Sequence, residues 1–473
     1  MYKTPSKHYL RLHFERSRFN RRLEDMLLIL ANHIINTGVI EKEQFNNLLD
    51  KIIRNTATTA LTEKTIKNHR TEMIRFFGLV KYVDNVAVPG NRISLLAQTQ
   101  DIPRFFKSFC KQFQFPGGFL KPDKVSEMVK SGVRFKPAKY ILQLFKVAES
   151  KYGEFAINAA EVAHFIFNDK RITAVGEKPV HVSERIMENR KEDVSVDKTS
   201  DIIRYARDFL NYMVEANLLH EFKGMYALNK MESKAIHSII ADKGFFDEYS
   251  KIIKKDGTWS VDDYKNVDKK WAEWFADEIE DKNLETPIKA LVKDDAQYPE
   301  QWKKIKELLE RKDPAFKGGA LKEIGDEGEK IVYEYEKTIV SKIRKDLVHL
   351  VKVVSKATSL GYDIISINAN EGRRKKYIEV KTTKKNYEPE VEIPFIISIN
   401  EWSVAEQHGD DYFIYRVIIT KEGVSIFVIQ NPVLRRKEGN LIIESIGFKV
   451  VYTAKSGGYI NLESIYEQTK ANN

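Results

Sequence analysis

The stretch GYDIISINANEGRRKKYIEVKTT, residues 361–383, decides the expected fold of the C-terminal part of the chain. Two β-branched runs flank a turn signal centred on Glu371, which predicts an antiparallel hairpin. In that hairpin Asp363 lies across from Glu379, and both side chains project to one face of the sheet. Lys381 shares this face because side chains on a strand repeat every two residues. The sequence therefore predicts two carboxylates and one lysine in one place.

Charges gathered in this way are costly when they are partly buried and unpaired, and a divalent cation between the two acids would remove that cost. Oxygen ligands favour Mg²⁺, or Mn²⁺ in its place, over zinc. An ion held by Asp363 and Glu379 would polarise a phosphodiester and lower the pKa of a bound water. Lys381 would orient that water or stabilise charge in the transition state. The basic turn residues Arg373 and Arg374 would hold a nucleic-acid backbone nearby.

In isolation, an Asp followed after fifteen residues by Glu-x-Lys is a weak signal, and the segment before the hairpin strengthens it. GDEGEKIVYEYEKTI (325–339) is predicted to be a helix with one apolar stripe, and Gly325 and Gly328 would let it approach the sheet closely. Glu329 would then point towards the metal, as a further ligand or as support for the other ligands. Glu336 is interpreted as part of an exposed acidic helix face.

The surrounding C-terminal sequence alternates short β-branched runs with turn signals, which predicts an α/β domain built on a mixed sheet. The runs are GYDIISINA, KYIEVKTT, PFIISI, DYFIYRVIIT and VSIFVIQNP. Upstream of them, RKDPAFKGG (311–319) contains one proline and two glycines. We interpret it as the hinge between a recognition part and a catalytic part.

Taken together, these motifs resemble a known family. The order G-x-x-G-E-x-x-V-x-x-x-E, G-Y-D-I-x-S, I-E-V-K-T-T, ISINEW and DYFIYRV, over roughly residues 321–430, resembles the protein NO VEIN C-terminal domain family. That family is similar to a branch of the PD-(D/E)xK nuclease superfamily, which is found in restriction and defence proteins. The resemblance covers about a quarter of the chain and implies a Mg²⁺-dependent nuclease.

The resemblance also assigns roles residue by residue. Asp363, Glu379 and Lys381 match the nuclease triad, and Glu329 matches the glutamate of the preceding helix. Tyr362 stands where the superfamily often has proline. Asn400, in the N-E-W run, is expected to cap the helix that follows, with a supporting part in catalysis as the alternative.

The first two-thirds of the chain is predicted to be mostly helical. LEDMLLILANHIINTGVI (23–40) is an apolar-rich helix. Residues 62–96 contain a helix that stops at Gly78, followed by two β-like runs around Pro89-Gly90-Asn91. A helix followed by a hairpin is the outline of a winged helix.

The helix within 62–96 has two distinct sides. Four apolar side chains share the side expected to be buried: Ile66, Met73, Ile74 and Phe77. The polar side is the candidate DNA-reading face, because cations contact phosphate or guanine and amides contact adenine. The candidate DNA-binding residues there are Lys64, Lys67, Asn68, Thr71 and Arg75. An ordinary solvated helix face is the alternative.

A second copy of the helix-and-hairpin outline is predicted at residues 199–229, after two further helices within 136–167. Its polar face includes Asp208 and Glu215, which would repel phosphate, so it is the weaker candidate for reading bases. In the stretch 258–310, three aromatic residues fall at helical spacing, and we expect them to pack in the core. They are Trp271, Trp274 and Phe275.

Composition narrows the class of partner and the compartment. The chain of 473 residues has a formal charge of +10, which favours polyanionic partners, with a generic basic surface as the alternative. Seven cations against one acid crowd the first 22 residues, as in arms that lie on a phosphate backbone. Cys110 is the only cysteine, which excludes internal disulfides and cysteine-based zinc sites. No apolar run approaches membrane-spanning length, so we expect a cytoplasmic protein without a membrane partner.

We predict four parts: a winged-helix-like DNA-recognition module (1–110), a second helical, winged-helix-like module (111–245), a helical linker (246–315) and a PD-(D/E)xK nuclease domain (316–473). The expected function is site-specific, Mg²⁺-dependent cleavage of double-stranded DNA, as in restriction endonucleases. A homodimer is the simplest way to cut both strands. Two alternatives stay open: a modification-dependent endonuclease that senses a methylated base, and a DNA-binding regulator with an inactive nuclease fold.

Overall fold

The computed structural model forms two compact units, each described by itself below. The residues it describes are 1–13, 23–56, 61–199, 201–254, 258–278, 280–285, 324–355, 360–371, 374–389, 391–445 and 448–460. The first unit comprises Met1–Asn20, Gly38–Ser94 and Pro103–Glu285, and the second comprises Arg21–Thr37, Leu95–Ile102 and Thr286–Asn473. Two short N-terminal segments therefore belong to the second unit, although they fall in the predicted N-terminal module. The predicted hinge at 311–319 lies outside the described residues, and the boundaries at 110 and 245 stay predictions.

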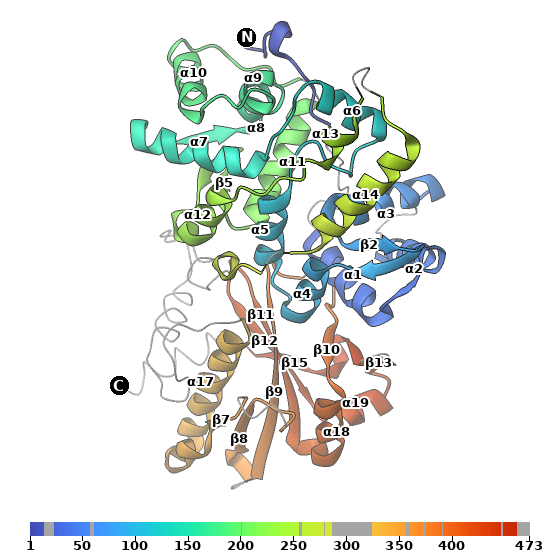
Figure 1. Ribbon diagram of the computed structural model, residues 1–473. Coiled ribbons are helices and arrows are strands. Elements are labelled where there is room, and N and C mark those ends of the chain that lie inside the picture. The colour runs from blue at the N-terminus through green and yellow to red at the C-terminus, as the bar shows by residue number, and fades with distance from the viewer. Residues whose placement is uncertain are drawn as a thin grey trace. The chain divides into compact units, whose positions relative to one another are not determined.

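In the first unit, the helix that stops at Gly78 is confirmed, and a hairpin follows it as predicted (Figure 1). The position predicted for the hairpin is wrong: its turn lies at Asp84 and Asn85, both at positive φ, and a helix begins at Asn91. Thr62 caps the helix by accepting a hydrogen bond from the Thr65 N–H, and Gly78 ends it in the left-handed conformation at φ 63°. The hairpin strands pair antiparallel, and a third strand joins them in the order β1-β3-β2. The elements are β1 (Ile40–Glu41), α2 (Lys42–Thr56), α3 (Glu63–Phe77), β2 (Val80–Val83) and β3 (Val86–Pro89).

The second helix-and-hairpin copy is also confirmed in the first unit. Strand β4 joins the hairpin in the order β4-β6-β5, so the two copies have three-stranded sheets of the same kind. The elements are α7 (Pro137–Tyr152), β4 (Ala156–Asn158), α8 (Ala159–Val162), α11 (Ile202–Glu215), β5 (Leu219–Phe222) and β6 (Met225–Leu228). A π-helical turn, Ala163–Phe167, continues α8.

An aromatic core fills the first unit around Phe113, which lies in contact with Phe119 at 4.8 Å between ring centroids. Trp271 and Phe275 are buried and stack at 5.1 Å, and Trp274 contacts Trp271, so the expected core packing of these rings is confirmed. The remaining helices between residues 91 and 276 are α4 (Asn91–Thr99), α5 (Ile102–Gln112), α6 (Pro122–Lys130), α9 (Lys170–Thr173), α10 (Pro179–Lys191), α12 (Ser233–Ala241), α13 (Glu248–Ile252) and α14 (Val261–Ala276).

The second unit is built on a six-stranded mixed sheet, as predicted for the C-terminal part. Its order is β15-β12-β11-β9-β8-β7; β9 and β11 run parallel, and the other neighbours are antiparallel. The strands are β7 (Lys352–Val353), β8 (Ile364–Asn368), β9 (Arg374–Lys384), β11 (Tyr412–Ile419), β12 (Val424–Gln430) and β15 (Gly458–Ile460). A smaller sheet contains β10 (Phe395–Ile397), β14 (Phe448–Tyr452) and β13 (Leu441–Ser445), in that order.

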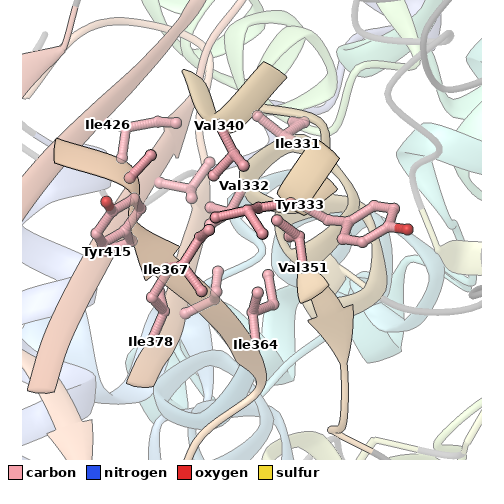
Figure 2. Packing of buried hydrophobic residues seen from close by; sticks show 14 of the residues in the cluster. Ile331, Val332, Tyr333, Val340, Val351, Ile364, Ile367, Ile378, Tyr415 and Ile426 are labelled. Carbon is pink, nitrogen blue, oxygen red and sulfur yellow. The ribbon is translucent and has the colours of Figure 1, made fainter. Parts of the chain in front are cut away.

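Helices cover both faces of the mixed sheet, and side chains alternate between the two layers. On one face, α17 (Ile324–Arg344) contributes Ile331 and Val332 to a buried cluster that also contains Ile378 of β9 (Figure 2). A Cβ on Gly328 would lie 1.9 Å from the Thr382 hydroxyl oxygen, so the predicted close approach of this helix is confirmed. The opposite face packs against α18 (Ile399–His408), with α19 (Pro432–Lys437) beside it (Figure 1). Helix α1 (Leu23–Thr37) also belongs to this unit.

Candidate active site

The register of the β8–β9 hairpin brings Asp363 and Glu379 together. Ile364 pairs with Ile378, so Asp363 and Glu379 are the next residues outward on the two strands, as the turn centred on Glu371 predicts. The Asp363 carboxylate accepts a hydrogen bond from the Val380 N–H at 2.8 Å. This bond replaces the next rung of the backbone ladder and fixes the carboxylate against β9.

Lys381 lies between two carboxylates on the same face of the sheet. Its Nζ is 2.6 Å from Oε1 of Glu379 and 3.0 Å from Oε2 of Glu401. The same Glu401 oxygen accepts the Ser398 N–H at 2.8 Å, and the Glu401 N–H donates to the Ser398 hydroxyl. This reciprocal capping box at the start of α18 fixes the Glu401 carboxylate, and Glu401 in turn fixes the ammonium of Lys381.

The capping prediction for Asn400 is wrong. Ser398 occupies the N-cap position of α18, and Asn400 lies exposed inside the first turn, with its amide beside Gly361. Glu401 belongs to the N-E-W run that resembles the NO VEIN family, but no role was expected for this acid. The local signal for it was present, because Ser-x-x-Glu before an apolar residue is a capping-box pattern.

Burial dominates the electrostatics of this cluster. Burial raises the pKa of Asp363 to about 6, against the opposing effects of the Val380 N–H and Lys381. Burial also raises the pKa of Glu379 well above its ordinary value, and the neighbouring acids Asp363 and Glu401 raise it further. Burial alone would lower the pKa of Lys381, but the two carboxylates beside it outweigh burial and raise that pKa. Three acids thus share one cation in a low-dielectric setting.

The chemistry of this donor set fits a hard divalent cation, because it offers carboxylate oxygens with an excess of negative charge. Within the described ranges, however, no group of three or more His, Cys, Asp or Glu side chains is already arranged around a metal position. The ammonium of Lys381 is the positive charge next to Glu379. Asp363 and Glu379 are therefore the residues that could hold an ion, with Lys381 as its competitor for Glu379.

Two of the α17 glutamates, Glu329 and Glu336, were singled out from the sequence, and the structure gives the partners of both. Glu329 accepts a hydrogen bond from the Ser355 hydroxyl at 2.6 Å and is not among the charges that shift the pKa of Asp363 or Glu379. Its role at the metal stays a prediction. The exposed position predicted for Glu336 is wrong: this side chain is buried and accepts hydrogen bonds from Lys376 and from the Tyr415 hydroxyl. Its partners are distant in sequence, so helical periodicity alone could not reveal them.

Tyr412 is a further residue at the site that the sequence did not single out. Burial raises the pKa of its phenol, and the carboxylates of Glu379, Glu401 and Asp363 add to that effect. The hydroxyl donates to the Gly361 carbonyl at 2.8 Å, so it fixes the chain two residues before Asp363. No motif signals this role, because an aromatic residue at the start of a strand is common.

The candidate DNA-reading face of α3 is partly exposed and partly occupied. The four predicted apolar residues of α3 are buried, and Lys64, Lys67 and Asn68 are exposed on the other side. Arg75 instead pairs with Asp268 at 2.9 Å and donates to the Gly118 carbonyl. This arrangement favours a structural role for Arg75 within the first unit. The Thr71 side chain lies outside the described part.

The remaining predicted cations are only partly described. Arg373 lies outside the described residues, and Arg374 pairs with Asp411 at 2.5 Å. In the basic N-terminal stretch, Lys3 pairs with Asp197, and Arg11 lies over the Tyr205 ring, so this part of the arm packs on the first unit. Residues 14–22 of the stretch are not described.

A known family model matches the N-terminal part of the chain and covers more than half of the whole chain. The chain belongs to the family of the restriction endonuclease BpuJI N-terminal domain, whose model matches residues 2–272. A solved structure titled as the BpuJ1 endonuclease binding domain in complex with pyrene- and phenanthrene-modified DNA is similar, with a TM-score of 0.52 and 26% identity. The match covers 57% of this chain and 98% of that one.

The C-terminal part matches a second model, protein NO VEIN, C-terminal, over residues 328–429, as the motifs indicate. Two proteins of Arabidopsis thaliana are similar there: protein NO VEIN-LIKE, 35% identical over 124 residues, and protein NO VEIN, 33% identical over 122 residues. Each match covers 25% of this chain but only 17% and 4%, respectively, of these relatives. In the parts of the chain that the structure describes, we find no helix with the length and apolarity that a membrane span requires.

Proposed function

We propose that this protein is a restriction-type endonuclease that hydrolyses DNA phosphodiester bonds with Mg²⁺, for which Mn²⁺ can substitute. One observation carries the proposal. In a chain of a restriction endonuclease family, Asp363, Glu379 and Lys381 converge on one face of a mixed sheet. This triad and its α/β setting support membership of the PD-(D/E)xK nucleases.

Each residue of the site has a separate proposed role. Asp363 and Glu379 would hold the ion, which would supply Lewis-acid polarisation of the phosphodiester and a nucleophile at neutral pH. Lys381 places its ammonium where negative charge develops on the phosphate, because Glu401 anchors it from the other side. Ser398 keeps Glu401 in place, and the Val380 N–H keeps Asp363 in place. Each acid must be ionised to hold the ion, so the raised pKa values favour metal binding at neutral pH over acidic pH.

DNA engagement is proposed for the first unit. The likeness of this unit to a DNA-complexed endonuclease binding domain supports this role, and so does the net charge of +10 of the whole chain. Helix α3 and its hairpin are proposed to act as a winged helix, with Lys64, Lys67 and Asn68 towards the groove. A homodimer is proposed for double-strand cleavage, because one site cuts one strand.

The test is digestion of plasmid DNA by the full chain, with unmodified and methylated substrates, in Mg²⁺ and in EDTA. Discrete fragments from unmodified plasmid in Mg²⁺, and none in EDTA, are expected. Cleavage restricted to methylated plasmid would instead assign a modification-dependent endonuclease. Retained DNA binding without cleavage of either substrate would overturn the nuclease proposal and leave a DNA-binding regulator.

A further inference from the structure

Four consecutive polar residues at the C-terminal end of β9 and directly after it are almost completely buried. Thr383, Lys384, Lys385 and Asn386 are 1%, 2%, 1% and 0% exposed. Burying two ammonium groups costs several kcal/mol each unless they are paired, on the order of the penalty for other buried ions. This end of the catalytic strand must therefore be held by partners from elsewhere in the second unit.

Those partners come from three separate segments of the second unit. Lys385 pairs with Asp25 of α1, and Lys384 pairs with Glu327 of α17. Asn386 donates to Glu24 through its amide at 2.7 Å and through its backbone N–H at 3.1 Å. The third segment, Leu95–Ile102, supplies Gln100. Both α1 and this third segment lie within the range matched by the BpuJI family model, yet they pack with the C-terminal sheet.

Gln100 is linked to Lys381 through one intervening residue, Arg416. Its side-chain oxygen accepts hydrogen bonds from the Thr383 hydroxyl and from the guanidinium of Arg416. Arg416, on β11, lies directly beside Lys381 in the parallel register and donates to the Lys381 carbonyl at 3.0 Å. Gln100 thus acts on the Lys381 peptide through one intervening side chain.

The backbone of Gln100 gives an independent sign that this side chain has a role. Its φ is 52°, in the left-handed region that glycine adopts most easily. A glutamine there is strained relative to the ordinary right-handed or extended conformation. A glycine would avoid most of this strain, so the strain accompanies a side chain that makes three buried hydrogen bonds, including one to the Pro394 carbonyl.

We propose that Gln100 is a positioning residue for the catalytic strand. Through Arg416 and Thr383 it holds the segment of β9 that carries Glu379 and Lys381 at the spacing the site requires. A residue of the BpuJI-type part of the sequence thereby completes the catalytic unit. The consequence for cleavage rests on the proposed nuclease function, whereas the effect on the order of β9 does not.

The test compares Gln100→Gly with Asn32→Ala in the full chain. Gln100→Gly removes the side chain but relieves the backbone strain, so the loss of folding stability is limited. Asn32 is an equally buried amide whose side chain donates to the same Pro394 carbonyl at 3.2 Å, and no hydrogen bond links it to Arg416 or Thr383. It therefore controls for the loss of a buried amide in the same place.

Two readouts decide the inference: amide hydrogen exchange of β9 and plasmid cleavage kinetics. For Gln100→Gly we expect at least about tenfold faster exchange at residues 379–383 and a kcat lowered by roughly 10–100-fold, with KM within about twofold. Gln100→Glu, which keeps the acceptor oxygens, should restore most of the kcat. Asn32→Ala should change neither readout by more than about twofold.

Unchanged exchange in Gln100→Gly, or an equal effect in Asn32→Ala, would overturn the positioning role. If β9 exchange rises while kcat stays at the wild-type value, Gln100 orders β9, but its role in catalysis is overturned. If the wild-type protein cleaves no DNA, the proposed function fails, and the exchange comparison still decides whether Gln100 holds β9.

Discussion

The two faces of strand β9 both bury charged side chains, but they balance the charge differently. On the α17 face, Lys376 is paired with the carboxylate of Glu336, which also accepts the Tyr415 hydroxyl. On the α18 face, three carboxylates share the single ammonium of Lys381. The Lys376 site has one anion for one cation, whereas the cluster around Lys381 has two more anions than cations if every group is ionised. The buried Arg416 on the same face donates instead to the Lys381 carbonyl and to Gln100.

This difference separates a structural ion pair from a candidate catalytic site. A buried pair with matched charge and satisfied hydrogen bonds needs nothing more, although removing one partner is costly. A buried excess of acid raises carboxyl pKa values and favours uptake of a cation. Burial of charge is therefore a weak sign of function, and imbalance of buried charge is a stronger one.

The largest expected effect comes from removing an acid on the unbalanced face. Glu379→Gln and Asp363→Asn should each lower the cleavage rate by at least about 10³-fold, because each removes a proposed metal ligand. DNA affinity should stay within about twofold, since the first unit is proposed to bind DNA. Plasmid cleavage and a filter-binding assay, both in Mg²⁺, measure the two quantities. A variant that still cleaves at the wild-type rate would remove that acid from the site.

Replacing the cation of the same face should have a smaller effect on catalysis. Lys381→Met should lower kcat by roughly 10²–10³-fold, because it removes the charge that faces the phosphate, while the ligands remain. Metal affinity should not fall and should rise if the ammonium competes with the ion for Glu379. Single-turnover cleavage and metal titration together check this, and normal cleavage by the variant would refute the role given to Lys381.

On the balanced face, the expected change is in stability. Glu336→Gln leaves the Lys376 ammonium buried without its counter-charge and should reduce the free energy of unfolding by about 3 kcal/mol. The folded protein should keep the wild-type kcat. Urea unfolding and active-site-normalised kinetics measure this contrast. If Glu336→Gln abolished cleavage without destabilising the fold, the distinction between the two faces would collapse.

The pH dependence of stability offers a more specific test. Because burial raises the pKa of Asp363 from 3.8 to about 6, the folded state binds this proton more tightly than the unfolded state. The contribution of Asp363 to stability is thus lost as pH rises between these values and is constant above them. Without metal, Asp363→Asn should exceed the wild type in stability by about 3 kcal/mol at pH 8 and by little at pH 4. Urea titrations at both pH values check this, and a difference independent of pH contradicts it.

The smallest expected effects concern two cations of α3: Arg75 is paired with Asp268, whereas Lys64 is exposed. Lys64→Ala should weaken DNA binding only a few-fold and reduce its salt dependence, as loss of one phosphate contact does. Arg75→Ala should mainly reduce stability, because its partners are Asp268 and Gly118. Binding measured at several salt concentrations, with thermal unfolding, separates the two outcomes. Unchanged binding for Lys64→Ala would mean that another element faces the DNA.

Local patterns predicted much of this molecule. The turn at Glu371 and the alternation of side chains sufficed to place Asp363 beside Glu379 and Lys381, because hairpin register depends on a short stretch of chain. The buried face of α3 followed from helical periodicity for the same reason. The NO VEIN-like motifs predicted the second family match.

Two of the misses share one physical cause, which is pairing between residues far apart in sequence. Glu336 was predicted to be exposed, because its partners Lys376 and Tyr415 lie 40 and 79 residues away. The packing of Gln100 with β9 and β11 spans still longer separations, of 283 and 316 residues to Thr383 and Arg416. The error at Asn400 differs, since the capping box beginning at Ser398 was visible locally and was overlooked.

The most direct measurement of the central claim is calorimetric titration of the protein with Mn²⁺, in parallel for the wild type, Asp363→Asn and Glu336→Gln. We predict saturable Mn²⁺ binding in the wild type and in Glu336→Gln. Loss of this binding in Asp363→Asn would locate the ion near the β8–β9 hairpin. Equal binding by all three proteins, or none by the wild type, would contradict the claim that the unbalanced face of β9 holds a divalent ion.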